Sequence, residues 1–277
     1  MVEIPLTYKC NSNCVMCTTV RPSKRKDKKS LDILKKIDSS DDSDTLVFTG
    51  GEPTMRHGWF SLFKYINKNY PKKKIKLLTN GRSFKYNKDS KRLSSIKNLE
   101  LSTEIHGTRL IHDKITCAYG SFNETMMGIK NLLNDGVSVE LRIVLHKMNY
   151  KNLIEIGKIM KENFKGIRKI IIFPIDLIGL AALNADDLFV SFKEFIPFVE
   201  EAVDFLSKDF NVQLYHIPFC KIDKRYHSFI ADRTVETMRF TDLKECNGCK
   251  YESFCPKVWR TYKGYMDKNQ LKESISV

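Results

Sequence analysis

The sequence predicts an α/β fold built on a parallel β-sheet. Apolar runs of strand length alternate with segments of helical periodicity, and this alternation repeats along most of the chain. The strand candidates are 2–8, 45–49, 74–79, 98–103, 138–145 and 168–174, and the helix candidates are 30–38, 58–69, 90–96, 121–135, 151–163 and 192–208. Consecutive βα units of this size imply a parallel sheet with right-handed crossovers. With 277 residues, of which 42% are hydrophobic, the chain can form one large domain with a small extension.

The first strand candidate is followed by a cysteine-rich loop, Cys10-Asn11-Ser12-Asn13-Cys14-Val15-Met16-Cys17, with the spacing C-x3-C-x2-C. Thiolates are soft ligands that suit zinc and iron–sulfur clusters. A four-iron cluster needs four ligands, so a loop with three thiolates would leave one iron for another ligand. From the spacing alone, two other interpretations of the loop remain: a zinc site, or three thiols with no shared role.

The second strand candidate is followed by Gly50-Gly51-Glu52-Pro53. In combination with the cysteine loop, this segment resembles the radical S-adenosylmethionine (SAM) enzymes. The resemblance implies that Cys10, Cys14 and Cys17 hold a [4Fe–4S] cluster, that SAM binds the remaining iron, and that Gly50-Gly51-Glu52-Pro53 binds the SAM amino group. It also implies a partial (βα)6 barrel of the TIM type, open on one side, with the chemistry at the C-terminal ends of the strands.

The resemblance also implies a reaction. The reduced cluster cleaves SAM to a 5′-deoxyadenosyl radical, which abstracts hydrogen from a substrate. A reductase, a ferredoxin or a flavodoxin would be the partner that supplies the electron.

Further SAM contacts are implied at the ends of the later strands. Thr79 and Asn80 begin a Thr-Asn-Gly segment that lines the SAM pocket in relatives and is otherwise simply a turn signal. Ser102 matches a serine that hydrogen-bonds SAM in relatives. Arg142 lies where an arginine often clamps the SAM carboxylate, a role that suits its two-pronged guanidinium. Gly179 follows the sixth strand candidate, where the resemblance places the adenine, and would permit close approach of the backbone.

The segment after the fourth strand candidate contains residues with two interpretations. Glu104 and His106 are substrate contacts or proton donors, or else solvated loop residues. Cys117 lies in a stretch shared with peptide-modifying radical SAM enzymes, which often have glycine there. It is either a small buried packing residue or a catalytic hydrogen-atom donor that quenches a substrate radical. Ser121 is expected to cap the following helix, with Glu124 completing a capping box.

The barrel pattern stops after residue 209, so we expect a core over 1–209 and a second region over 210–277. The second region contains Cys220, Cys246, Cys249 and Cys255, which by spacing could hold structural zinc. After a radical SAM barrel they resemble the twitch or truncated SPASM extension. This resemblance implies an auxiliary [4Fe–4S] cluster with four protein ligands, suited to electron transfer or structural support.

Composition limits the partners. The net charge of +14 fits a lysine-rich or heat-adapted composition, or attraction to an anionic partner. The lysine runs do not alternate with aromatic residues, so nucleic acid is not expected as a partner. There is no signal peptide and no apolar run long enough to span a bilayer, so we expect no membrane insertion and a cytoplasmic location. In that compartment eight cysteines indicate metal ligands rather than disulfides.

Two enzymatic hypotheses follow from these patterns. The leading one is modification of a ribosomally made peptide or protein, favoured by residues 111–122 and the cysteine tail. Against it, the first strand begins at once and leaves no N-terminal peptide-recognition domain. The alternative is small-molecule oxidation or cyclisation, acting on a sugar alcohol or a nucleotide, because residues 50–56 resemble a segment of the molybdopterin-precursor GTP cyclase. A non-catalytic metal-binding or RNA-binding protein has only the net charge in its favour.

Overall fold

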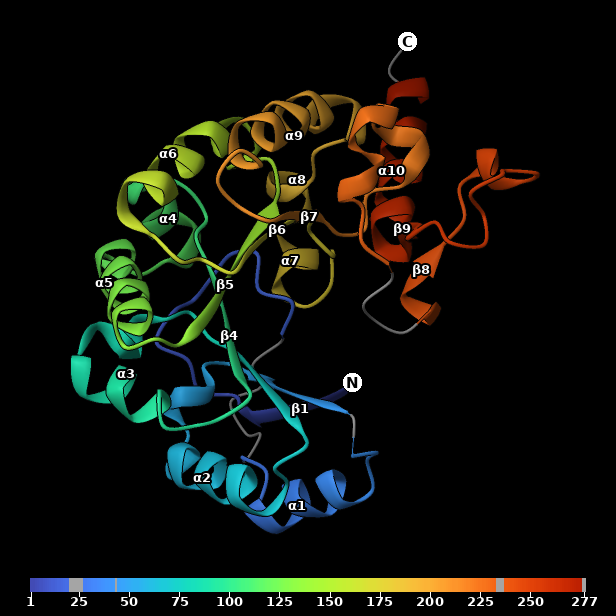
Figure 1. Ribbon diagram of the computed structural model, residues 1–277. Helices are drawn as coiled ribbons and strands as arrows, with labels where there is room; N and C mark the ends of the chain where they lie inside the picture. Colours follow the sequence, from blue (N-terminus) through green and yellow to red (C-terminus); the bar gives the residue numbers. More distant parts are fainter. Residues whose placement is uncertain (20–26, 43, 233–236, 276–277) are drawn as a thin grey trace.

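The computed structural model describes residues 1–19, 27–42, 44–232 and 237–275. Seven strands form one parallel sheet whose order follows the sequence from β1 to β7. These are β1 (Val2–Thr7), β2 (Thr45–Gly50), β3 (Lys74–Leu78), β4 (Leu99–Glu104), β5 (Ser138–Leu145), β6 (Lys169–Pro174) and β7 (Val212–Leu214). Figure 1 shows the sheet curving inside a layer of helices. Because β1 and β7 are the two ends of the sheet, the barrel is partial. The predicted α/β fold is therefore confirmed, with one strand more than expected.

A layer of helices covers the outer, convex face of the sheet, and α10 stands apart from it (Figure 1). The helices described are α1 (Ser30–Asp38), α2 (Trp59–Asn69), α3 (Asn87–Leu93), α4 (Arg109–Thr116), α5 (Ser121–Asn134), α6 (Leu153–Asn163), α7 (Leu180–Leu183), α8 (Ala185–Leu188), α9 (Phe192–Leu206) and α10 (Arg260–Ile275). The helix candidates are confirmed as α1, α2, α3, α5, α6 and α9. Helix α4 was not predicted, and neither were the two short helices α7 and α8 nor α10.

Strand β5 shows why these segments form strands. Val139, Leu141 and Ile143 alternate along it and are fully buried in the main hydrophobic core. The residues between them, Glu140 and Arg142, belong to the opposite face of the sheet, because successive side chains of a strand point to opposite sides. β-Branched and apolar residues suit a surface buried under helices, and the polar residues are left for the inner side of the barrel.

The inner side contains a buried ion network that connects several strands. Glu140 is fully buried and accepts hydrogen bonds from Lys76 Nζ on β3 at 2.8 Å and from Ser102 Oγ on β4 at 2.9 Å. It also pairs with Lys169 Nζ on β6 at 3.1 Å. Burial raises the pKa of Glu140, but Lys76 and Lys169 outweigh this effect and hold that pKa below its ordinary value. The network fixes four strands relative to one another below the mouth of the barrel.

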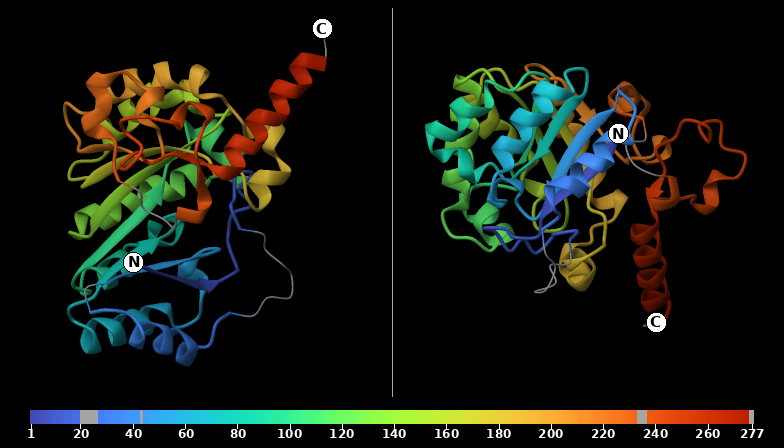
Figure 2. Two further views of the ribbon diagram at one scale, coloured as in Figure 1. Left: turned by 90° about the vertical axis from the view of Figure 1, so that its right-hand side faces the viewer. Right: turned by 90° about the horizontal axis from the view of Figure 1, so that it is seen from below.

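The chain after α9 first adds β7 to the sheet, beyond the boundary expected at residue 209. An antiparallel pair, β8 (Phe240–Thr241) and β9 (Val258–Trp259), then leads into α10. Trp259 Nε1 donates to the Pro174 carbonyl at 3.0 Å, at the end of β6. Figure 2 shows α10 projecting from the body beside this attachment. The C-terminal region is thus joined to the barrel near the end of β6.

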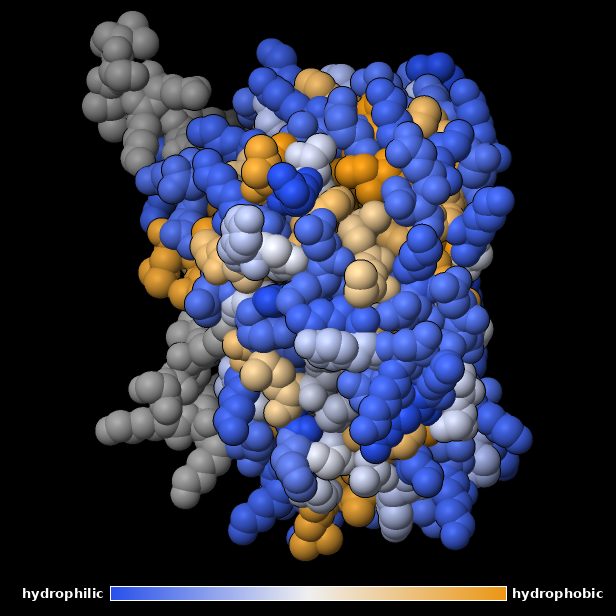
Figure 3. All heavy atoms as spheres, turned by 90° about the vertical axis from the view of Figure 1, so that its left-hand side faces the viewer, coloured by the Kyte–Doolittle hydropathy of each residue, from blue (hydrophilic) through white to orange (hydrophobic). Residues whose placement is uncertain are grey.

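The outer face of the barrel is mainly hydrophilic. Figure 3 shows scattered apolar side chains among polar ones over the helical layer. The outer helices thus carry charged and polar residues toward solvent, while their buried apolar residues pack into the core against the sheet. Among the helices described, none is long and apolar enough to cross a membrane.

Candidate active site

The cysteine loop and the glycine-rich turn lie against each other at the C-terminal ends of β1 and β2. Gly51 N donates to the Thr7 carbonyl at 2.7 Å, and Glu52 N donates to the Lys9 carbonyl at 2.7 Å. A Cβ on Gly51 would lie 2.3 Å from the Lys9 oxygen, and one on Gly50, which has φ +136°, would lie 2.2 Å from the Thr7 oxygen. The two glycines are therefore required for the turn to approach the chain that enters the cysteine loop.

Glu52 joins the ends of β2 and β3. Its carboxylate is fully buried and accepts hydrogen bonds from Thr79 Oγ1 at 2.7 Å, Thr54 Oγ1 at 2.6 Å and Asn80 N at 2.8 Å. Burial raises the pKa of Glu52, and these donors oppose the rise. Pro53 follows at the start of a short 3₁₀ turn, Pro53–Met55. Within the structure Glu52 holds the turn in place, and contact of residues 50–53 with the amino group of SAM stays a prediction.

Two side chains from the end of β3 contact the cysteine loop. Asn80 Nδ2 donates to Asn11 Oδ1 at 2.6 Å and lies 4.0 Å from Cys10 Sγ. Arg82 Nη1 donates to Ser12 Oγ at 2.9 Å and to the Asn11 carbonyl. The structure thus places Asn80 beside the first cysteine. Sequence reasoning missed Arg82, although a long cationic side chain directly after a Thr-Asn-Gly turn was a usable signal.

The other side of the loop is bonded to α4 and to the segment after β6. Asn13 N donates to the Thr116 carbonyl and Val15 N to the Ile115 carbonyl, both at 2.9 Å. Asn184 Nδ2 donates to the Val15 carbonyl at 2.9 Å. The C-terminal end of α4 therefore supplies carbonyl oxygens that would otherwise lack helical partners, and they bind the loop backbone.

Gly179 lies directly against the end of the cysteine loop. It has φ +62°, and a Cβ there would lie 2.4 Å from the Thr18 carbonyl oxygen. Nearby, Ala181 N donates to the Cys17 carbonyl at 3.1 Å. The close approach that the sequence suggested is therefore made to the loop backbone. Contact of Gly179 with the adenine of SAM stays a prediction.

The donor set of the loop fits an iron–sulfur cluster. Cys10, Cys14 and Cys17 are partly exposed at the mouth, and the loop backbone is held on two sides by the protein. Among the residues described, no group of three or more His, Cys, Asp or Glu side chains has the spacing to hold a metal ion as it stands. Three soft donors on one short, fixed loop match the ligand chemistry of such a cluster, and the cluster itself stays a proposal.

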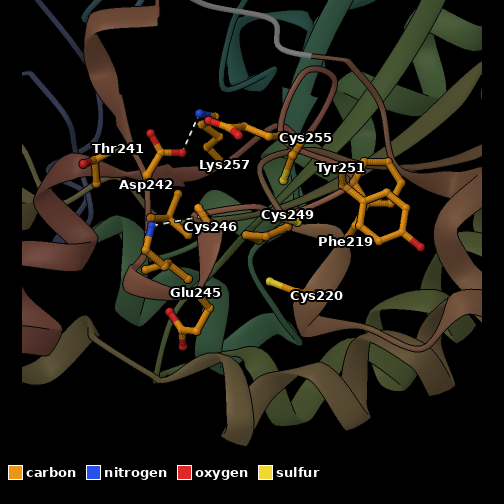
Figure 4. A pocket seen from close by; sticks show the side chains of 14 residues that line it. Phe219, Cys220, Thr241, Asp242, Glu245, Cys246, Cys249, Tyr251, Cys255 and Lys257 are labelled. Carbon is orange, nitrogen blue, oxygen red and sulfur yellow. Dashed lines mark hydrogen bonds and ion pairs between the residues drawn. The ribbon is translucent and has the colours of Figure 1, made fainter.

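The four C-terminal cysteines line one small pocket with a cavity volume of about 20 Å³. Figure 4 shows Cys220, Cys246, Cys249 and Cys255 gathered around it. Burial raises the pKa of Cys220 and of Cys246, and the nearby Cys255 thiol adds to both rises. A bound cation would favour the thiolate forms and release their protons. The structure therefore brings the four residues that the sequence grouped to one pocket. Their thiols are donors of the type that zinc and iron–sulfur clusters use, but as they stand they are not spaced to hold a metal ion.

Arg142 and Phe173 form a cationic position on the inner side of the barrel. The Arg142 guanidinium lies 4.6 Å from the centre of the Phe173 ring. Arg142 Nε is buried without a hydrogen-bond partner among the described residues. Glu104 lies beside Arg142 on the neighbouring strand; burial raises the pKa of Glu104, and Arg142 opposes this rise. A guanidinium with an unsatisfied donor is suited to an anionic group.

His106 is buried behind Glu104. Its side chain is 3% exposed, and its Nε2 lies 3.5 Å from Glu104 Oε2. Burial lowers the pKa of His106 to about 4, so the imidazole is neutral near pH 7. The interpretation of His106 as a solvated loop residue is therefore wrong. Thr79 and Ser102 also lie at the site, but their hydroxyl groups donate to the buried carboxylates of Glu52 and Glu140.

Cys117 lies at the exposed C-terminal end of α4. It has φ +47° and occupies the C-cap, so it is in the left-handed conformation that glycine adopts most easily. The interpretation of Cys117 as a buried packing residue is therefore wrong. The alternative, a hydrogen-atom donor, stays a prediction, and solvent exposure of the thiol does not support it.

The sequence pattern of the Radical SAM superfamily matches residues 4–160. Fe-coproporphyrin III synthase of Methanosarcina barkeri is 27% identical over 168 residues, which cover 57% of this chain and 40% of that protein. A probable GTP 3′,8-cyclase of Saccharolobus islandicus is 25% identical over 193 residues, which cover 68% of this chain and 61% of that protein. The chain thus spans less than two thirds of the length of either curated relative.

Two solved structures share the fold over different extents. Native anSMEcpe with bound AdoMet and Cp18Cys peptide has a TM-score of 0.68 at 14% identity, covering 94% of this chain and 88% of that one. Streptococcus suis SuiB bound to precursor peptide SuiA has a TM-score of 0.63 at 15% identity, covering 78% and 49%. The family match extends over more than half of the sequence and includes both the cysteine loop and the glycine-rich turn, and from it we conclude that this chain belongs to the radical SAM superfamily of enzymes.

Proposed function

We propose that this protein reductively cleaves SAM and uses the resulting 5′-deoxyadenosyl radical to modify a ribosomally made peptide or protein. The observation that carries the first part is the fixed cysteine loop. Its backbone is bonded to α4 through Asn13 and Val15, and its Asn11 and Ser12 side chains are bonded to the β3 turn. In the proposal, Cys10, Cys14 and Cys17 hold a [4Fe–4S] cluster that supplies the electron for SAM cleavage, fed by a reductase, a ferredoxin or a flavodoxin.

Arg142 is the proposed partner of the SAM carboxylate. It is a permanent cation on the inner face of β5, and its Nε has no hydrogen-bond partner among the described residues. Losing a hydrogen bond to a charged group costs about 1.5–3 kcal/mol. We therefore expect Arg142→Ala to weaken SAM binding roughly tenfold to a hundredfold, measured by equilibrium dialysis with anaerobically reconstituted protein. Arg168→Ala, which removes a 60% exposed arginine, is the control. Equal SAM affinity in both variants would contradict this role.

The peptide substrate is supported by the structural neighbours. SuiB was solved bound to a precursor peptide, and anSMEcpe with a bound peptide. The anSMEcpe likeness covers 94% of this chain, so it extends beyond the barrel. The C-terminal pocket is part of the proposal: Cys220, Cys246, Cys249 and Cys255 would hold an auxiliary [4Fe–4S] cluster that serves electron transfer or structural support. A cytoplasmic location, where such thiols stay reduced, is also proposed.

A small-molecule substrate is the second candidate. The curated relatives are named for a porphyrin and for GTP, and this naming favours the alternative. The test is substrate-dependent formation of 5′-deoxyadenosine by reconstituted protein with SAM and a reductant. Short peptides encoded beside the gene, GTP and Fe-coproporphyrin III would be supplied separately. We expect a peptide to raise the formation of 5′-deoxyadenosine, and we expect the mass of that peptide to change. Stimulation by GTP or the porphyrin alone would replace the peptide proposal with the small-molecule one.

A further inference from the structure

Arg82 connects the proposed cluster loop to the helical layer. It begins a short 3₁₀ turn, Arg82–Lys85, directly after the Thr-Asn-Gly segment. Its Nη1 donates to Ser12 Oγ at 2.9 Å and to the Asn11 carbonyl, both between the first two cysteines of the loop. Its Nε donates to Glu124 Oε2 on α5 at 2.7 Å. One guanidinium, whose side chain is 13% exposed, therefore bridges two segments far apart in the sequence.

Helix α5 holds this arginine in place. Glu124 also pairs with Lys85. Burial raises the pKa of Glu124, but the hydrogen bonds from Lys85 and Arg82 outweigh this effect and hold that pKa below its ordinary value. Gly128, one turn further along α5, packs so closely that a Cβ would lie 2.1 Å from the Gly81 carbonyl oxygen. The turn that carries Arg82 is thus fixed against the helix, and Glu124 remains ionised.

The position of this cation has an electrostatic consequence. Reduction potentials of iron–sulfur clusters depend on net charge and on hydrogen bonding around the sulfur atoms. One-electron reduction adds negative charge, and a nearby permanent cation with little solvent screening stabilises the reduced form. Asn80 Nδ2, 4.0 Å from Cys10 Sγ, is placed by the same turn. Arg82 is therefore in a position to affect both the loop geometry and the ease of reduction.

We propose that Arg82 is a positioning residue that fixes the loop between Cys10 and Cys14, and that its charge raises the reduction potential of the cluster bound there. Glu124 orients it. The inference rests on the proposed function, because it takes the three loop cysteines as the cluster ligands. It adds a residue outside the cysteine and glycine motifs whose loss would make the electron harder to deliver.

The test compares three variants of the full chain after anaerobic reconstitution. Arg82→Gln keeps hydrogen-bond donors and removes the charge, and Arg82→Lys keeps the charge. Lys85→Gln removes a neighbouring charge that pairs with Glu124, whereas the bonds to Asn11 and Ser12 come from Arg82. A redox titration followed by electron paramagnetic resonance would use the signal that changes when SAM is added, which identifies the loop cluster. For Arg82→Gln we expect about a tenfold smaller equilibrium constant for reduction, or about 59 mV for one electron.

The two controls define the outcomes. We expect Arg82→Lys and Lys85→Gln to stay within about threefold of the unmodified protein, a smaller shift than the tenfold change expected for a lost adjacent charge. Equal potentials in all four proteins would overturn the inference, as would an equal shift in Lys85→Gln and Arg82→Gln. If Arg82→Gln assembles no loop cluster while the other two variants do, the positioning role is supported. An unmodified protein without any SAM-responsive signal would instead overturn the proposed function.

Discussion

The two cysteine-containing regions are held in different ways. The N-terminal loop donates hydrogen bonds to α4 and accepts them from the β3 turn and from the segment after β6. The C-terminal cysteines lie on short turns whose backbone bonds are local, such as Cys246 N to Leu243 O at 3.1 Å and Cys249 N to Cys246 O at 3.0 Å. The protein itself therefore organises the loop from several elements. The backbone of the C-terminal turns is bonded mainly within those turns, so a group bound by the four thiols would contribute more to their order.

Acid would affect the barrel mouth first. Burial lowers the pKa of His106 to about 4 and those of His112 and His146 to about 3. Unfolded histidine has a pKa near 6.5, so below that pH the unfolded chain binds more protons than the folded one. Stability is then fully present above about pH 6.5 and falls as the pH drops toward 4. We expect a loss of about 2 kcal/mol for each imidazole between pH 6.5 and 5.

Urea unfolding of the metal-free protein at several pH values would measure this loss. His106→Gln should reduce the pH dependence, whereas His57→Gln, at an exposed position, should not. A pH dependence that stays the same in His106→Gln would contradict the assignment of His106 as a buried neutral group.

Metal removal should distinguish the two regions directly. Structural metal sites contribute several kcal/mol to the folding of the segments that bind them. We therefore expect a chelator to speed amide hydrogen exchange about a hundredfold in residues 242–256, and to change exchange in residues 10–17 much less. The measurement is exchange followed by mass spectrometry before and after chelation. A similar change in both segments would remove the distinction between a loop organised by the protein and a pocket organised by metal.

Glu52→Gln would loosen the barrel mouth without removing a thiol. The amide nitrogen cannot accept, so Thr79 Oγ1 or Asn80 N would lose its buried acceptor. The expected loss of unfolding free energy is about 1–3 kcal/mol, measured by urea denaturation. Glu201→Gln, at an exposed position on α9, is the matched control. Equal stability of the two variants would show that the Glu52 hydrogen bonds do not hold the mouth.

Tyr262→Phe tests the attachment of the C-terminal region and should have the smallest effect. Tyr262 is 1% exposed, and its hydroxyl donates to the Val190 carbonyl at 2.5 Å. Losing one such bond costs about 1 kcal/mol, visible as a lower urea midpoint. Tyr119→Phe, at a fully exposed tyrosine, is the control. The account predicts unchanged metal content in the N-terminal loop, and a loss of loop metal in Tyr262→Phe would contradict it.

The fold was largely predictable because each main strand carries a run of buried apolar residues. Strand β7 was missed because it has only three residues, Val212–Leu214. The capping box expected at Ser121 and Glu124 is wrong. Gly120 is the N-cap, and Asp113 on α4 accepts hydrogen bonds from Gly120 N and Phe122 N, both at 2.8 Å. Asp113 could not be identified as the competing acceptor from local spacing, because it lies about eight positions away on a helix that was not predicted.

The site was predictable where its signals are local. The cysteine spacing and the glycine-rich turn can be recognised within a few residues. The partners of Ser102, Glu52 and Arg82 could not be predicted, because each bonds to a residue on another strand or loop. Polar residues grouped at the ends of parallel strands indicate a site, but the choice between a ligand and a neighbouring side chain depends on tertiary packing.

The central claim is that the N-terminal loop, and not the C-terminal pocket, is where SAM is cleaved. The direct measurement is 5′-deoxyadenosine formed by anaerobically reconstituted protein with SAM and dithionite, together with iron and zinc content. The comparison requires a Cys10→Ala, Cys14→Ala, Cys17→Ala triple variant and a Cys249→Ala variant. The account predicts about eight iron per unmodified chain, as in two four-iron clusters, no product from the triple variant, and product still formed by Cys249→Ala. Product from the triple variant would contradict the assignment.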